Sequence, residues 1–173
     1  TICYNLICSR TVPETILAHG GRPYRTPVGH SLIKKIMRAE DAIFGGEHSG
    51  HYYFRDNWYA ESGLIAMLAV LSLLSKDDKP LSEVVAPLEN RFQSGEINLT
   101  VDDKPAAIAR VKAYFLDKGA QADELDGLTI DYPDRWFNIR ASNTEPLLRV
   151  NVEGDTKEAM ETLRDEVLKV IGV

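Results

Sequence analysis

The rhythm of apolar segments changes near residue 90 of this 173-residue chain. Before that point, short strand-like runs such as TICYNLICS alternate with amphipathic helical segments. This alternation predicts a three-layer α/β domain on a mixed, largely parallel sheet. After that point, strand-like runs follow one another within residues 127–154 between helical patterns, which predicts a small α+β domain with an antiparallel sheet. We therefore expect two domains, residues 1–90 and 91–173.

Turn signals and periodicity predict the individual elements. The apolar run GLIAMLAVLSLL, from Gly63 to Leu74, is shorter than the about 20 residues that span a bilayer, so it indicates a buried helix. Asp155 and Glu158 have the spacing of a capping box at the start of the last helix. Helices are expected over residues 12–21, 31–40, 59–75, 81–92, 104–119 and 155–173, and strands over 1–9, 42–45, 51–56, 95–101, 127–133, 135–142 and 147–154.

Composition narrows the classes of protein that fit. With 44% hydrophobic and 27% charged residues, the chain resembles an ordinary globular protein with a sizeable core. The net charge of −6 argues against nucleic-acid binding, so any bound anion needs a local positive cluster. Cys3 and Cys8 lie on opposite faces of a strand by alternation, which argues against a disulfide and favours a reducing compartment such as the cytoplasm. Because the first residue is Thr1, the chain is expected to be a piece of a longer protein.

The segment GGEHSGH, residues 45–51, interrupts an apolar stretch with glycines and polar side chains. It follows a predicted buried strand, at the sheet edge where α/β domains bind ligands. Glu47 and Ser49 offer the acceptor and donor groups that sugar hydroxyls need, and His51 can move a proton near neutral pH. The alternative is a tight turn in which Glu47 and Ser49 cap their own backbone.

A second polar segment, RASNTEPLLR, begins at Arg140. The planar fork of an arginine suits phosphate oxygens, and a loop with short donors can add converging N–H groups. The alternative is an ordinary turn that ends at Pro146, with Arg140 in a surface salt bridge. The short donors of the predicted phosphate cradle are Ser142, Asn143 and Thr144.

These segments together resemble the α-D-phosphohexomutase family. GGEHSGHYYFRD is similar to the family's sugar-recognition loop, RASNTEPLLRVNVE to the phosphate-binding loop of its last domain, and TPVGHSLIKK to a third family segment in the same order. The first of them is most similar to phosphomannomutases and to dual phosphomannomutase/phosphoglucomutases, rather than to phosphoglucosamine mutases. The resemblance implies a sugar-binding third domain without its N-terminal part, residues 1–90, and a phosphate-binding fourth domain that is similar to the TATA-binding protein, residues 91–173.

The resemblance also implies roles for single residues. Glu47 and Ser49 would bind the sugar's 3- and 4-hydroxyls, and His51 would be the catalytic residue that assists proton transfer. His30 and Gly50 would line the same substrate-binding cleft. The residues expected to clamp the non-reacting phosphate are Arg140, Ser142, Asn143 and Thr144. One position departs from the family pattern, because Ile7 precedes the CSR sequence where relatives carry a lysine.

The implied activity is that of a phosphomannomutase, which interconverts mannose 6-phosphate and mannose 1-phosphate through a hexose 1,6-bisphosphate and a phosphoserine. The family's phosphoserine loop and its magnesium-binding Asp-Gly-Asp loop have no counterpart in this sequence. We therefore expect the chain to bind hexose phosphate, to hold no metal itself, and to be inactive without the missing N-terminal domains that bind Mg²⁺. Nucleic acid and membranes are not expected partners. The alternatives are another phosphohexomutase of the family, such as a phosphoglucomutase, and a non-catalytic module that binds sugar phosphates.

Overall fold

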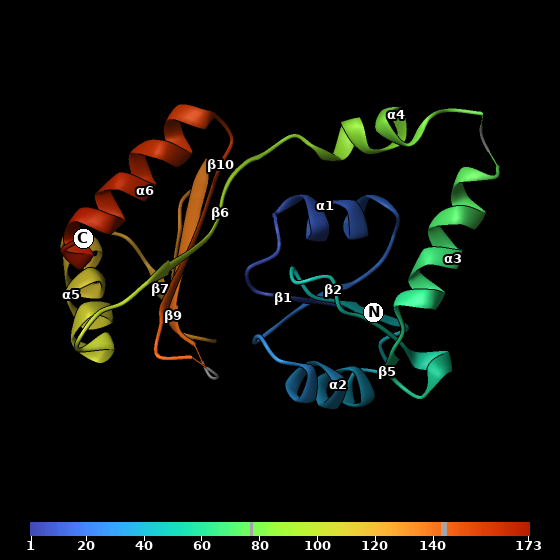
Figure 1. Cartoon of the computed structure of the whole chain (residues 1–173), viewed down its shortest axis with the longest axis horizontal. Helices are drawn as coiled ribbons and strands as arrows, with labels where there is room; N and C mark the ends of the chain where they lie inside the picture. The colour runs from blue at the N-terminus through green and yellow to red at the C-terminus, as the bar shows by residue number, and fades with distance from the viewer. Residues whose placement is uncertain (77, 143–144) are drawn as a thin grey trace. The chain divides into compact units, whose positions relative to one another are not determined.

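The computed structural model describes residues 1–76, 78–142 and 145–173. It divides into two compact units, Thr1–Asn90 and Arg91–Val173. Each unit has a sheet of its own, which Figure 1 shows, and each has its own hydrophobic core.

The sheet of the first unit has the strand order β2-β1-β3-β4-β5. β1 pairs in parallel with β2 and β3, whereas β4 is antiparallel to β3 and β5 is antiparallel to β4. Figure 1 shows α1 and α2 on opposite faces of this sheet, so the predicted α/β fold with a mixed sheet is confirmed. The elements are β1 (Ile2–Asn5), α1 (Thr11–Ala18), β2 (Pro23–Thr26), α2 (His30–Ala39), β3 (Phe44–Gly46), β4 (Tyr52–Phe54) and β5 (Ala60–Glu61).

Packing of α2 against the sheet explains one of the glycines. Ile33 and Met37 are one helical turn apart and fully buried, so they form the core-facing side of α2. A Cβ atom added at Gly45 would lie 2.6 Å from the Met37 sulfur. Gly45 is therefore required by the close approach of α2 to β3.

The predicted burial of the apolar helix is wrong. α3 (Gly63–Leu74) forms, and the Ser62 hydroxyl caps it by accepting a hydrogen bond from the Ile65 N–H at 3.2 Å, but none of its side chains is buried. Its apolar residues point in every direction around the axis, so no single face of the first unit can cover them. Leu68 and Leu71 remain 54% and 52% exposed.

The predicted helix over residues 81–92 is too long. α4 (Leu81–Val85) is followed by a 3₁₀ turn (Ala86–Leu88), and β6 (Phe92–Leu99) begins at the last residue of the predicted helix. Pro87 lies in that turn and has no backbone N–H to continue an α-helix.

The second unit has the strand order β6-β10-β9-β8-β7, with every pair antiparallel. The consecutive strands β8, β9 and β10 form the predicted meander. Alternate residues of β9 and β10, such as Phe137 and Val150, pack in one core with Phe115 of α5 and Leu163 of α6. The elements are α5 (Lys104–Asp117), β7 (Ala122–Asp123), β8 (Leu128–Asp131), β9 (Arg135–Ala141), β10 (Leu148–Gly154) and α6 (Lys157–Ile171).

Three smaller predictions have clear outcomes. Thr156, rather than Asp155, caps α6, because its hydroxyl accepts the Ala159 N–H at 3.1 Å and Asp155 pairs with Arg91. Neither Cys3 nor Cys8 is part of a disulfide, as predicted, although β1 ends before Cys8. In the described part of the chain, no helix combines the length and hydropathy that crossing a membrane requires.

Candidate functional site

The polar segment of the first unit is the loop of a hairpin. β3 ends at Gly46 and β4 begins at Tyr52. The Glu47 N–H donates to the His51 carbonyl at 2.9 Å, and the Gly50 N–H donates to the Glu47 carbonyl at 3.0 Å. Gly50 has a φ of 83°, a left-handed conformation that favours glycine. The loop therefore lies at the carboxyl end of a strand, as the sequence predicts, and this strand, β3, is the central one of the sheet but only partly buried.

Glu47 links three other elements at this edge of the sheet. Its side chain is buried, and one carboxylate oxygen accepts the Tyr53 hydroxyl at 2.5 Å. The other oxygen accepts the Gly29 N–H at 3.2 Å and the Asn5 amide at 3.4 Å. Asn5 ends β1 and Gly29 precedes α2, so Glu47 joins the carboxyl ends of neighbouring parallel strands. The turn in which Glu47 caps its own backbone is not what the structure has.

The sequence did not predict Tyr53 and Asn5 as site residues. Tyr53 is fully buried, and its pKa is raised by burial and, to a smaller degree, by the hydrogen bond to Glu47. The Asn5 side-chain oxygen also accepts the His48 N–H at 3.3 Å and so steadies the loop. The available signal was an amide within the apolar run TICYNLIC, since buried amides need partners.

The remaining predicted residues of this loop are exposed. Ser49, Gly50 and His51 lie on the solvent side of the hairpin, and His30 is exposed at the start of α2. The loop thus combines a buried, hydrogen-bonded carboxylate with accessible hydroxyl and imidazole groups. This combination of acceptors and donors matches the hydroxyl groups of a sugar.

His51 has a charged neighbour. Its Nδ1 lies 2.7 Å from a carboxylate oxygen of Glu61, which is on β5. The pKa of His51 is raised chiefly by this hydrogen bond, while burial opposes the shift and the charge of Glu47 adds to it. Sequence reasoning missed Glu61 because nothing predicted the two-residue strand that carries it.

Ile7 is buried, with 5% of its surface exposed. The position where the family resemblance implies a lysine therefore supplies neither a charge nor a hydrogen-bond donor to a ligand at this edge.

The arginines of the second polar segment are part of an ionic cluster. Arg140 lies near the end of β9 and directly opposite Arg149 of β10. Glu96 of β6 has one carboxylate oxygen 3.5 Å from Arg140 and the other 3.5 Å from Arg149. Arg149 also pairs with Glu145. Arg140 is 3% exposed, so the predicted alternative of a surface salt bridge does not describe it, although the side chain of its partner Glu96 is 27% exposed.

The ion pairs of this cluster join two arginines to two glutamates. A bound phosphate would therefore compete with carboxylates for the guanidinium groups. The Ser142 N–H donates to the Leu147 carbonyl at 2.9 Å, and its hydroxyl accepts the Glu145 N–H at 3.2 Å. The other two predicted phosphate ligands, Asn143 and Thr144, lie outside the described residues.

No group of three or more histidine, cysteine, aspartate or glutamate side chains within residues 1–76, 78–142 and 145–173 is arranged to hold a metal ion.

Models of known families match both units. A model described as the alpha/beta/alpha domain III of phosphoglucomutase/phosphomannomutase matches residues 1–92. The model of the C-terminal domain of the same family matches residues 96–170.

Known proteins of this kind are similar to almost the whole chain. A phosphomannomutase from Methanocaldococcus jannaschii is 41% identical over 98% of this chain, which spans 37% of that protein's length. The crystal structure of a phosphoglucomutase/phosphomannomutase family protein from Burkholderia thailandensis matches 98% of this chain and 37% of its own, with a TM-score of 0.83 and 31% identity. The N-acetylphosphoglucosamine mutase of Aspergillus fumigatus, solved with glucose 1,6-bisphosphate, has a TM-score of 0.70 over 98% of this chain and 38% of its own, and at 14% identity shares the fold alone.

Proposed function

The chain belongs to the phosphoglucomutase/phosphomannomutase family, and on that premise we propose that it forms the C-terminal part of a phosphomannomutase. The parent enzyme would interconvert mannose 6-phosphate and mannose 1-phosphate through a hexose 1,6-bisphosphate. The observation that carries the proposal is the Glu47 loop at the carboxyl edge of the sheet, in a chain similar to proteins named phosphomannomutase.

The hairpin loop would recognise the sugar. Glu47 makes three hydrogen bonds, and a carboxylate has about four acceptor positions, so it can take one further bond from a sugar hydroxyl. Ser49 would add a donor and an acceptor at the exposed side of the loop, and Gly50 leaves space there because it has no side chain. His30, at the start of α2, would line the same side of the cleft.

His51 would exchange a proton with the reacting hydroxyl. Its imidazole is accessible, and its raised pKa makes it a stronger base than an isolated imidazole. During phosphoryl transfer, the sugar hydroxyl would form the new O–P bond and give its proton to His51. In the reverse transfer, the same imidazole would return that proton.

The second unit would hold the phosphate that does not react. Arg140 would supply two parallel N–H donors, and Ser142, Asn143 and Thr144 would supply shorter ones. Support comes from the adjacent Arg149, a second cation at the same end of the strand pair. Binding would require the arginines to exchange Glu96 for the phosphate oxygens.

The rest of the catalytic apparatus would belong to the preceding domains of the parent enzyme. These domains would supply the phosphoserine that donates the phosphoryl group, and the loop that binds Mg²⁺. A hexose 1,6-bisphosphate would act as intermediate and activator. This chain alone would bind hexose phosphate without turning it over.

The exposed helix α3 supports the proposal that preceding domains pack against this chain. A cavity of about 590 Å³ lies between α3 and the aromatic side chains of Phe44, Tyr52 and Phe54, and its lining is almost wholly apolar. Because the chain spans only 37% of the similar phosphomannomutase, we assign this surface to the polypeptide that precedes the matching region in such proteins. Two cysteines outside any disulfide agree with a reducing compartment, so the cytoplasm is the proposed location.

A phosphoglucomutase is the second candidate. The similar protein from Burkholderia thailandensis carries both names, phosphoglucomutase and phosphomannomutase. Glucose and mannose phosphates differ in the orientation of one hydroxyl group, and the described residues of the loop fit both sugars.

The proposal can be tested on this chain by titration with mannose 6-phosphate, followed by amide NMR. We expect shifts in the residues of the hairpin loop, and a loss of these shifts in Glu47→Gln. Glu83→Gln, an exposed glutamate on α4, is the matched control and should respond like the unaltered chain. If Glu47→Gln binds the sugar phosphate as the control does, Glu47 serves the fold and not the ligand.

A further inference from the structure

Glu61 belongs to no predicted site, yet its position is fixed by the sheet. β5 pairs with β4 in antiparallel register, so that Glu61 lies opposite Tyr53. The Ser62 N–H donates to the Tyr52 carbonyl at 3.0 Å and continues this ladder. His51 precedes β4 directly, which makes it the diagonal neighbour of Glu61 across the strand pair. Long side chains reach one another across such a diagonal.

The two side chains form a short ionic hydrogen bond. His51 Nδ1 lies 2.7 Å from Glu61 Oε1, the length of a charge-assisted N–H···O bond. An ionised glutamate can only accept, so the proton must be on Nδ1. The neutral imidazole then has its lone pair on Nε2, where it can accept a proton from a ligand. Glu61 thus selects the tautomer of His51 as well as its orientation.

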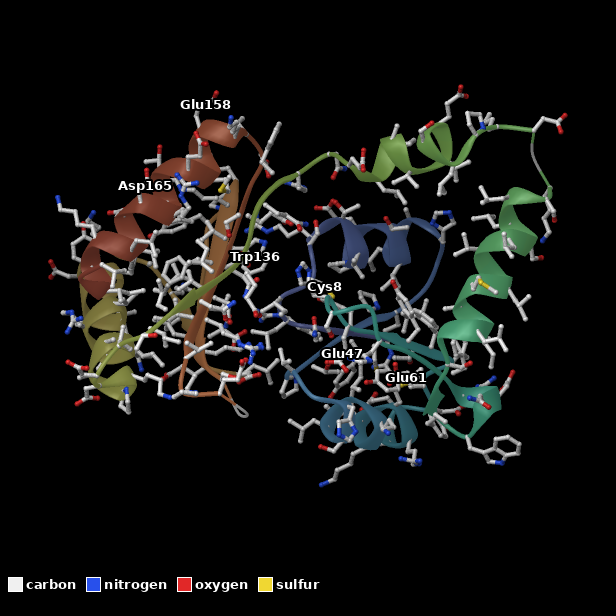
Figure 2. All side chains as sticks on the ribbon, in the orientation of Figure 1. Cys8, Glu47, Glu61, Trp136, Glu158 and Asp165 are labelled. Carbon is white, nitrogen blue, oxygen red and sulfur yellow. The ribbon has the colours of Figure 1, made fainter. Side chains whose placement is uncertain are left out.

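The charged groups that act on His51 come from two elements. Glu61 on β5 is hydrogen-bonded to His51, and Glu47 in the hairpin loop acts on it through its charge. Figure 2 labels both glutamates. Both are negative, so both favour the protonated imidazole. Because the side chains of His51 and Glu61 are 49% and 45% exposed, their pair adds little to the stability of the fold.

From this geometry we propose that Glu61 is a positioning residue for His51 in phosphoryl transfer, an inference that rests on the proposed function. As the hydroxyl oxygen of the hexose forms a bond to phosphorus, the bond from phosphorus to the donor oxygen breaks and the donor keeps the electron pair. The hydroxyl proton moves to His51 Nε2. The negative charge of Glu61 stabilises the imidazolium that results, in the way a buried aspartate serves the histidine of a catalytic triad.

The pairing itself can be measured on this chain by nitrogen-15 NMR of the histidine rings across a pH titration. Neutral His51 should carry its proton on Nδ1. In Glu61→Gln the pKa of His51 should fall, because the charge is lost while an acceptor remains. In Glu61→Ala the preference for the Nδ1–H tautomer should be lost as well. Glu83→Gln is the control and should change neither property. An unaltered pKa and tautomer in both Glu61 variants would overturn the inference, whatever the enzyme activity.

Kinetics of the chain assembled with its preceding domains give an independent measurement. Glu61→Gln should lower kcat roughly 10-fold with little change in KM, less than the about 10²- to 10⁴-fold that a lost acid–base group costs in His51→Ala. The acidic limb of the pH profile of kcat should move to lower pH, since a His51 with a lower pKa loses its proton at a lower pH. Full activity of Glu61→Gln would overturn the inference. If instead His51→Ala were active while the NMR pairing stood, the proposed role of His51 would fail and the pairing would remain.

Discussion

At the scale of single residues, the site combines structural and accessible polar groups. Glu47 is held by donors from three elements, whereas His51 is half exposed and has one carboxylate partner. The sequence predicted Glu47 and His51 as site residues because polar side chains stand out within an apolar run. It could not predict Tyr53 as the partner of Glu47, because an aromatic residue in a strand is equally typical of an ordinary core.

Tyr53→Phe tests the anchoring of Glu47. The change removes one hydroxyl from a fully buried ring and leaves a carboxylate oxygen without its donor, so the free energy of unfolding should fall by about 1–3 kcal/mol. Because the folded state raises the pKa of Tyr53, this contribution should be full below the ordinary tyrosine pKa of about 10 and should decline at higher pH. Urea unfolding at several pH values measures it. Tyr52→Phe, at an exposed ring of the same strand, is the control, and an equal loss in both variants would contradict the anchor.

Glu96 should compete with phosphate. It is the carboxylate between Arg140 and Arg149, so Glu96→Gln should tighten the binding of mannose 6-phosphate, whereas Arg140→Ala should weaken it roughly 10-fold or more. Arg140→Lys keeps the charge without the fork and should lie between Arg140→Ala and the unaltered chain. Calorimetric titration ranks the variants, with Arg164→Lys on α6 as the control. Weaker binding by Glu96→Gln would show that Glu96 orients the arginines and does not oppose the ligand.

At the scale of helices and strands, local signals predicted most elements. The buried residues of α5 and α6 recur at helical spacing, and the strands β8, β9 and β10 each pair with the next strand in the sequence. The errors in the predicted elements come from features that the pattern of apolar residues does not reveal. Pro87 ends a helix that the apolar pattern would continue, and β5 exists only because its two residues pair with β4. The prediction that α3 is buried was wrong, because an apolar helix needs a surface to pack against but its sequence does not show that this chain supplies one.

Substitution in α3 should cost this chain little. Leu68 is more than half exposed, so Leu68→Gln should change the free energy of unfolding by no more than about 0.5 kcal/mol. Leu163→Gln on α6 is the matched comparison and should cost about 2 kcal/mol or more, because that side chain is 1% exposed. Chemical unfolding of both variants decides the point. A large loss in Leu68→Gln would mean that α3 is covered within this chain.

At the scale of the whole molecule, the sequence predicted two regions with different chemistry, and the contacts of the chain divide it into Thr1–Asn90 and Arg91–Val173. Each region contains one of the two predicted polar loops. The sequence could not predict that the arginines of the second loop are balanced by Glu96, since that residue is 44 positions before Arg140 in the chain and meets it only through strand pairing. Long-range ion pairs of this kind follow from register and not from local pattern.

The central claim is that this chain is one part of a phosphomannomutase, and phosphorus NMR of the conversion of mannose 6-phosphate to mannose 1-phosphate tests it most directly. The assay would contain Mg²⁺ and glucose 1,6-bisphosphate. It would compare the chain alone with the chain fused behind the polypeptide that precedes the matching region in the Methanocaldococcus jannaschii phosphomannomutase, and with that intact protein as the positive control. We predict no mannose 1-phosphate from the chain alone and turnover by the fusion. Turnover by the chain alone, or a correctly folded fusion that converts nothing while the intact protein does, would contradict the claim.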